Sequence, residues 1–388
     1  MKKLAIVTTH PIQYYAPIFK LLAQRNIIQV RVFYTWEQSQ NGEKYDPGFG
    51  KKIEWDIPLL EDYDYTFVKN ISTNPGTHHF KGIINPSLIK EIQEYNPAAI
   101  LIFGWNFDSH LKCIRFFHKK IPVLFRGDST LLDEKKGFSI KKIARRIFLK
   151  WIYKHVDIAF YTGINNKQYF SVLGLKDNQL VFAPHAIDNN RFGNEKENYA
   201  QQALAQRQKL GIKNDELVIL FAGKFEPKKD PAIILQLAKK LRKEKIKFLL
   251  VGNGILEKDL KAAAFNNQKI HFLDFQNQQL MPVIYRLGDV FLLPSKGPGE
   301  TWGLAVNESM ASGKPILISN KCGCAADLVI NGKTGYIFSA TNESDLLEKF
   351  QLMNNKDLLI ELGNASKELI QEYSFEKIVS AIESSITI

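Results

Sequence analysis

Cysteine is scarce in this chain of 388 residues, which contains only Cys113, Cys322 and Cys324. Three thiols cannot all pair within one chain, so a disulfide framework is not expected. Cys322 and Cys324 flank a glycine and can be interpreted as half a metal site, but no second pair of ligands follows at a suitable spacing. We interpret them as two small buried thiols beside a turn, and we expect neither a metal nor another cofactor.

Long apolar runs are also missing. No stretch approaches the ~20 apolar residues that a membrane-spanning helix needs. The chain opens on Met1, Lys2 and Lys3, as a signal peptide does, but the apolar run that follows ends at Val7. Such a run is too short for the hydrophobic part of a signal. We therefore expect a cytoplasmic protein, with peripheral contact at the inner face of the membrane as an open option.

Acidic residues are outnumbered, with 40 Asp and Glu against 52 Lys and Arg, which gives a formal net charge of +12. The electrostatic field of such a positive net charge favours anionic partners, among them nucleic acid, nucleotide-sugars and an acidic membrane surface. The basic residues lack the interleaved aromatic side chains that are typical of a nucleic-acid surface. We therefore expect no nucleic-acid partner.

What the chain does contain is a series of short apolar runs that alternate with helical stretches. The first cycle has such runs at 4–7, 30–34, 98–103 and 122–125, and a second cycle has them at 217–222, 248–251 and 290–293. Continuous apolar runs of this length are typical of strands buried in a parallel sheet. The alternation predicts the α/β class, and the polar, charge-rich residues between the two cycles predict a connection between two domains.

The strongest functional signal is the segment PSKGPGETWGLAVNESMASG at 294–313, which directly follows a predicted strand. A glycine-bearing loop that enters a helix presents free N–H groups to an anion, and Gly303 lets the backbone approach a ligand closely. Glu308 can accept hydrogen bonds from a ribose, and Glu300 from a sugar. A nucleotide-sugar carries both phosphates and hydroxyls. The alternative is a capped helix with a solvated glutamate.

A second signal is FAGKFEPKKD at 221–230, which also follows a predicted strand. Gly223 allows a tight exit from this strand. Lys224 and Lys229 can converge on an anion and neutralise a leaving diphosphate without a metal. The alternative is a charged surface loop, because lysine is usually solvated.

These segments resemble those of the family 4 retaining glycosyltransferases. GETWGLAVNESMASG is similar to their Glu-x7-Glu signature, and FAGKFEPKKD to their Gly-Arg-Leu…Lys loop. The resemblance implies the GT-B fold, in which two Rossmann-like domains face each other across a cleft. It implies an N-terminal acceptor-binding domain (1–192), a C-terminal nucleotide-sugar-binding domain (193–372), and a last helix (373–388) that returns to the first domain.

The resemblance also implies roles for single residues on the donor side. Glu300 would hold hydroxyls of the donor sugar, and Glu308 would hold the ribose. Gly303 and Leu304 would offer backbone N–H groups to the sugar and the phosphate. Lys229 would bind the diphosphate.

The chain departs from the family's pattern in three places. Lys224 stands where arginine is usual, so bidentate contact with phosphate is lost there. His185 stands where asparagine is usual. The segment THPIQYY at 9–15 replaces the glycine-rich loop that often follows the family's first strand.

Four residues in the first half are candidates for the acceptor side. His10 and Gln13 are polar groups at the carboxyl end of the first predicted strand, and Arg126 and Asp128 follow another one. A histidine bonded to nearby backbone is the alternative for His10. An internal ion pair is the alternative for Arg126 and Asp128.

The stretch IKKIARRIFLKWIYK at 140–154 is basic and amphipathic. Ile140, Ile143, Ile147 and Trp151 fall on one helical face, and cations fill much of the rest. Such a helix can rest on an anionic bilayer. It can also be an ordinary domain helix that packs its apolar face inward.

Together these features and the resemblance imply a retaining glycosyltransferase that moves a sugar from a nucleotide-sugar to a glycan or lipid-linked acceptor, in the assembly of cell-surface polysaccharide or glycolipid. The sequence shows no evident nucleophile, which fits substitution on the front face of the sugar. Two alternatives stay open. One is a sugar-nucleotide epimerase of the same fold, which needs no acceptor. The other is a non-catalytic nucleotide-sugar binding protein.

Overall fold

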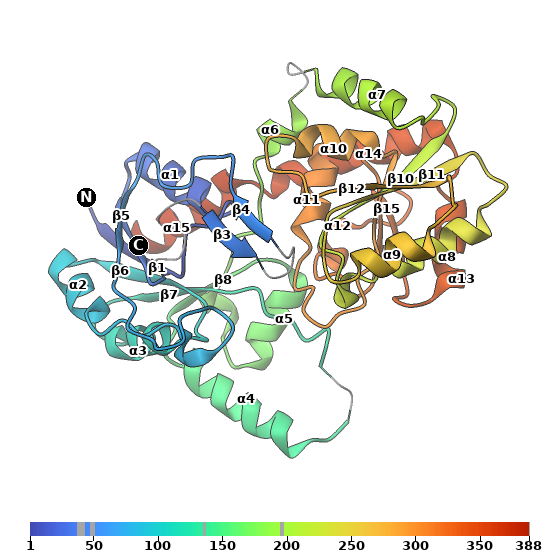
Figure 1. Ribbon diagram of the computed structural model, residues 1–388. Helices are drawn as coiled ribbons and strands as arrows, with labels where there is room; N and C mark the ends of the chain where they lie inside the picture. The colour runs from blue at the N-terminus through green and yellow to red at the C-terminus, as the bar shows by residue number, and fades with distance from the viewer. Residues whose placement is uncertain (37–42, 47–50, 135–136, 195–197, 388) are drawn as a thin grey trace. The chain divides into compact units, whose positions relative to one another are not determined.

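The computed structural model describes residues 1–36, 43–46, 51–134, 137–194 and 198–387 (Figure 1). Contacts between Cα atoms divide the chain into two compact units. The first comprises Met1–Lys44, Ile57–His185 and Phe375–Ile388, and the second comprises Tyr45–Asp56 and Ala186–Ser374. Each unit contains its own parallel sheet with helices between the strands, which confirms the predicted α/β class.

The first unit is built on a seven-stranded sheet in the order β5-β2-β1-β6-β7-β8-β9. Its strands are β1 (Lys3–Thr8), β2 (Gln29–Tyr34), β5 (Asp64–Phe67), β6 (Ala99–Phe103), β7 (Val123–Arg126), β8 (Ile158–Tyr161) and β9 (Leu180–Phe182). Its helices are α1 (Ala16–Arg25), η1 (Phe80–Gly82), α2 (Leu88–Tyr95), α3 (Asp108–Phe117), α4 (Ile140–Tyr153), α5 (Ile164–Val172), η2 (Asp177–Gln179) and α15 (Phe375–Thr387). The side chains of β1 and β6 are buried on both faces of the sheet, which is why both strands are continuous apolar runs in the sequence.

The last helix, α15, packs against α1 within the first unit. Arg25 at the end of α1 lies 3.0 Å from the carboxylate of Glu383. The Nζ atom of Lys2 donates to the carbonyl oxygen of Ile386 at 2.7 Å. The chain therefore ends in the unit in which it begins.

The second unit is built on a six-stranded parallel sheet in the order β12-β11-β10-β13-β14-β15. Its strands are β10 (Leu217–Ala222), β11 (Ile246–Val251), β12 (Ile270–Leu273), β13 (Val290–Leu293), β14 (Ile316–Ser319) and β15 (Gly335–Phe338). Its helices are α6 (Asn189–Gly193), α7 (Tyr199–Lys209), η3 (Pro227–Lys229), α8 (Ala232–Lys240), α9 (Glu257–Ala263), α10 (Met281–Leu287), α11 (Leu304–Ala311), α12 (Ala325–Leu328), α13 (Glu343–Gln351), α14 (Lys356–Leu369) and η4 (Ile370–Glu372). A separate two-stranded sheet pairs β3 (Glu43–Asp46) with β4 (Lys51–Glu54).

The units differ from the predicted domain ranges mainly at residues 45–56, which the prediction placed in the first domain. Asp56 accepts hydrogen bonds from the backbone N–H of Gln279, and the side chain of Gln279 donates to the carbonyl oxygen of Asp56 at 2.6 Å. These contacts join positions that are far apart in the sequence. They attach the end of this segment to the second unit.

Candidate active site

The strand order of the second unit indicates one place for a ligand. β10 lies inside the sheet, with β11 on one side and β13 on the other. The loops that leave the carboxyl ends of β10 and β13 therefore start side by side and lead to opposite halves of the sheet, and ligands of open α/β sheets bind at such points. These loops carry 223–230 and 294–303, the two strongest signals in the sequence.

Lys229 and Glu300 meet at this point. The Nζ atom of Lys229, the last residue of η3, lies 2.5 Å from Oε2 of Glu300. The hydroxyl of Ser295 donates to the same carboxylate oxygen at 2.9 Å. The side chains of Lys229 and Glu300 are only 15% and 7% exposed, so water screens their attraction less than at an open surface. The pair sets a cation beside a hydrogen-bond acceptor in a sheltered position.

Further contacts tie the two loops together. The backbone N–H of Lys296 donates to the carbonyl oxygen of Lys228 at 2.8 Å, and its Nζ atom lies 2.9 Å from the carboxylate of Asp230. Lys224 lies half-buried at the start of the first loop. The relative position of Lys229 and Glu300 is therefore supported by neighbours on both loops.

The turn that contains the two C-terminal cysteines supports the second loop. The backbone N–H of Gly323 donates to the carbonyl oxygen of Glu300 at 3.0 Å, and a Cβ atom at Gly323 would collide with the carbonyl oxygen of Thr301. Cys322 and Cys324 are fully buried free thiols, and burial raises the pKa of Cys322 to about 12. Their interpretation as buried thiols beside a turn is confirmed.

Helix α11 carries the second glutamate. It starts after Gly303, whose φ of 102° is left-handed and where a Cβ atom would lie 3.1 Å from Leu293 Cδ2. Glu308 is buried about one turn into the helix, and the hydroxyl of Tyr285 on α10 donates to its Oε2 atom at 2.6 Å. The start of α11 thus combines the positive end of a helix dipole with a carboxylate that a neighbouring helix orients.

The glycines that leave no room for a side chain lie close to Gly223, the glycine that the sequence singled out. A Cβ atom at Gly223 would only touch the ring of Phe221, at 3.5 Å. After β11, by contrast, Gly252 and Gly254 have φ values of 141° and 155°, and a Cβ atom at Gly252 would collide with the carbonyl oxygen of Gly223. Two glycines directly after a predicted strand were visible in the sequence and could have indicated this close approach. Tyr285 and Ser295 gave no such signal, because their roles depend on contacts between separate elements.

In the first unit, the loop after β1 carries His10 and Gln13. β1 lies between β2 and β6, so this loop also leaves the sheet where the strand order reverses. The Nδ1 atom of His10 lies 3.0 Å from the hydroxyl of Thr9, and its ring meets Trp36 edge-on at 5.3 Å between centroids. The side-chain oxygen of Gln13 is buried and has no hydrogen-bond partner in the part of the chain that the structure describes. An unpartnered amide oxygen is suited to accept a hydrogen bond from a hydroxyl group.

Arg126 and Asp128 have different surroundings. Arg126 is 2% exposed, and its guanidinium donates to the carbonyl oxygens of Ala183 and Pro184 at 2.7 and 2.8 Å. Asp128 lies 3.6 Å from the ring nitrogen Nε2 of His185, whose pKa is lowered chiefly by burial. Arg126 therefore supports the backbone after β9. A direct role of Arg126 and Asp128 towards an acceptor stays a prediction.

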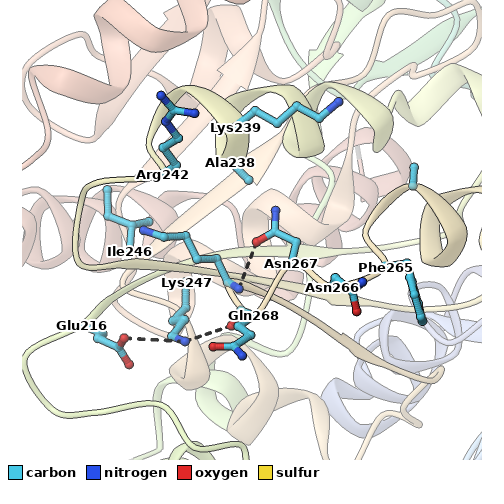
Figure 2. A pocket seen from close by; sticks show the side chains of 12 residues that line it. Glu216, Ala238, Lys239, Arg242, Ile246, Lys247, Phe265, Asn266, Asn267 and Gln268 are labelled. Carbon is cyan, nitrogen blue, oxygen red and sulfur yellow. Dashed lines mark hydrogen bonds and ion pairs between the residues drawn. The ribbon is translucent and has the colours of Figure 1, made fainter.

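A pocket of about 790 Å³ lies elsewhere in the second unit (Figure 2). It is lined by residues at the amino ends of β10, β11 and β12 and by the end of α8, and it shares no residue with the candidate site. Its cations include Lys247, which donates to the carbonyl oxygen of Gln268 at 2.9 Å. Because the pocket opens at the amino ends of the strands, it is separate from the loops after β10 and β13.

Comparison with solved structures gives the fold. The chain resembles Anabaena HepE, solved in complex with UDP and glucose, with a TM-score of 0.71 at 16% identity, and the match covers 100% of both chains. A likeness at this identity concerns the fold. The chain has the GT-B fold of two Rossmann-like domains, as predicted.

Comparison of sequences gives the relatives of the chain. Residues 202–369 match the family model of the glycosyl transferases group 1. An uncharacterized glycosyltransferase of Methanocaldococcus jannaschii is 30% identical over 42% of this chain and 46% of its own length. A sulfoquinovosyl transferase of Arabidopsis thaliana is 25% identical over 77% of this chain and 58% of its own length. The chain thus spans about half the length of the curated relatives that it matches.

Proposed function

We propose that the protein is a retaining glycosyltransferase that moves a sugar from a nucleotide-sugar donor to a glycan or lipid-linked acceptor. The observation that carries the proposal is the contact between Lys229 and Glu300 beside the start of α11. The match of residues 202–369 to the family model of the glycosyl transferases group 1 supports the reaction class. A structural neighbour that binds UDP and glucose supports a nucleotide-sugar donor.

In this proposal each site residue binds a different part of the donor. Lys229 contacts the diphosphate, with Lys224 nearby on the same loop, and the backbone N–H groups of Gly303 and Leu304 bind phosphate and sugar. Glu300 accepts hydrogen bonds from hydroxyls of the sugar, and Glu308 accepts them from the ribose. Because Lys229 and Glu300 touch, the junction between sugar and diphosphate would lie at this pair.

The bond that breaks joins the anomeric carbon to the diphosphate oxygen. The acceptor hydroxyl attacks from the same face, its proton passes to the leaving phosphate, and the anomeric configuration is retained. The chain then contributes charge stabilisation of the leaving diphosphate and positioning of the acceptor. Two lysines and a helix start supply the positive charge, so we expect the reaction to proceed without a metal.

In this proposal the first unit binds the acceptor. His10 and Gln13 are the candidates with polar atoms at the strand-order reversal of that sheet. A glycan or lipid-linked acceptor in the assembly of cell-surface polysaccharide or glycolipid fits a relative that is a lipopolysaccharide 1,2-N-acetylglucosaminetransferase of Salmonella typhimurium.

The experiment follows a labelled sugar from a panel of nucleotide-sugars in the presence of a bacterial lipid and glycan extract. The proposal expects the label on a second molecule, together with release of the nucleoside diphosphate. A changed sugar that stays attached to the nucleotide would indicate an epimerase instead. Binding of the donor without its consumption would indicate a non-catalytic binding protein.

A further inference from the structure

Helix α4 lies at the edge of the first unit (Figure 1). Several of its apolar side chains are exposed. Ile140 is 76% exposed, Ile147 is 64% exposed, and Ile143 is exposed between them. Phe138, directly before the helix, is 85% exposed. Single exposed apolar residues are common on proteins, but a contiguous group on one helix marks an interaction surface.

The same helix packs into the core through another face. Leu149, Ile152 and Tyr153 are buried in the core of the first unit. At about 100° per residue, the three exposed isoleucines lie on roughly the opposite side of the helix from these buried residues. Ile140, Ile143 and Ile147 therefore do not pack against the core, whereas Trp151, the fourth residue of the predicted apolar face, is partly buried against it. The core also covers Leu149, Ile152 and Tyr153 and leaves the three isoleucines exposed.

The other faces of the helix carry cations. Residues 140–154 contain six lysines and arginines and no carboxylate. Glu134 pairs with Lys142 at 3.2 Å and with Arg146 at 2.7 Å. The four remaining cations of this stretch are exposed, namely Lys141, Arg145, Lys150 and Lys154.

We propose that α4 docks the protein on an anionic lipid bilayer. The isoleucines and Phe138 would enter the boundary between headgroups and acyl chains, while the lysines and arginines extend to the lipid phosphates. A second copy of the chain is a poorer occupant, because pairing two such faces would bring cations against cations. No helix in the described part of the chain is long and apolar enough to cross a membrane. With 14 residues, α4 would lie along the surface.

This proposal goes beyond the transfer reaction and does not depend on it. Vesicle binding can be measured with no nucleotide-sugar present, so its failure and a failure of the proposed reaction are separate results. If both hold, docking through α4 would hold the protein at the surface in which a lipid-linked acceptor is embedded.

The test is co-sedimentation of the full chain with vesicles of phosphatidylcholine, with and without phosphatidylglycerol. The wild type should bind the anionic vesicles, and its binding should weaken as salt is raised. The double variant Ile143→Asn/Ile147→Asn should bind about tenfold more weakly, because it removes two apolar side chains from the interface. Lys141→Gln/Arg145→Gln should also bind about tenfold more weakly.

Matched controls change similar residues elsewhere on the surface. Ile360→Asn on α14, where Ile360 is 62% exposed, and Lys209→Gln/Lys258→Gln should bind vesicles as the wild type does. All of these side chains are exposed, so the melting temperatures should stay unchanged. The proposal is overturned if the wild type ignores anionic vesicles or if the isoleucine variant binds them like the wild type. It is equally overturned if the isoleucine variant only abolishes self-association or binding to an acidic protein.

Discussion

Lys229 and Glu300 are each the nearest charged neighbour that the structure records for the other, and neither can be removed without leaving its partner in a largely buried position. An uncompensated buried charge is costly, so substitutions here affect both stability and chemistry. Tests at this scale therefore need a stability measurement beside each kinetic one. They also need control residues from the same loops.

Replacing Lys229 should slow the chemical step. Lys229→Ala should lower kcat by roughly 10²–10³, the scale for losing one preorganised group that stabilises developing charge. Lys228→Ala is the matched control, because Lys228 is 37% exposed and pairs with Glu226 at 3.4 Å. Steady-state kinetics on protein shown to be folded by thermal melting makes the comparison. Turnover of Lys229→Ala within about threefold of wild type would remove Lys229 from the mechanism.

Substitutions of Glu300 and Glu308 should change different kinetic parameters. Glu308, if it holds the ribose, contacts a group remote from the reacting carbon, so Glu308→Gln should mainly raise the donor KM. Glu300, if it holds the sugar, positions the reacting ring, so Glu300→Gln should mainly lower kcat.

Calorimetry with the bare nucleoside diphosphate separates the two roles. Glu308→Gln should weaken its binding, whereas Glu300→Gln should leave it nearly unchanged, because that ligand carries no sugar. Equal weakening by both variants would show that the assignment of one carboxylate to each ring is wrong.

At the scale of elements, the strands and the loops after them could be predicted because strands buried on both faces are continuous apolar runs. The segments 223–230 and 294–303 could be located in this way. That they start side by side could not, because it depends on β13 pairing with β10 although β11 and β12 come between them in the sequence. The contacts of Ser295 with Glu300 and of Tyr285 with Glu308 could not be predicted either, because they too depend on the tertiary structure.

For helix α4, the sequence pattern predicted the element but not which of its faces packs against the core. Its periodicity correctly indicated an amphipathic helix, and Ile140, Ile143, Ile147 and Trp151 correctly shared a face. The pattern did not tell which face meets the core, since Leu149, Ile152 and Tyr153 form a second apolar side. That choice depends on the neighbours that the fold supplies.

The close approach of the loops after β10 and β11 gives a prediction at this scale. Gly252→Ala should destabilise the protein by about 1–3 kcal/mol, because the residue is left-handed and its new methyl group collides with the backbone of Gly223. Gly223→Ala is the matched control and should change stability by less than about 1 kcal/mol, since its methyl group only touches Phe221. Urea unfolding of both variants checks this. Equal stabilities would show that the two loops adjust without strain.

At the scale of the whole molecule, two Rossmann-like units and a final helix that returns to the first unit form one chain of the GT-B fold. The net charge of +12 suits an anionic donor, and the cations of α4 suit an anionic surface. The residues proposed to bind the donor lie in the second unit, and the acceptor candidates lie in the first.

The claim that the loops after β10 and β13 form a nucleotide-sugar site without a metal is tested most directly by thermal shift. The full chain is melted in EDTA with each member of a panel of nucleotide-sugars, beside the double variant Glu300→Gln/Glu308→Gln. One nucleotide-sugar at 100 times its dissociation constant should stabilise the wild type by about 2.7 kcal/mol, and the variant should lose most of this shift. The claim is contradicted if no nucleotide-sugar raises the melting temperature of the wild type, if the shift appears only after Mg²⁺ or Mn²⁺ is restored, or if the double variant keeps the full shift.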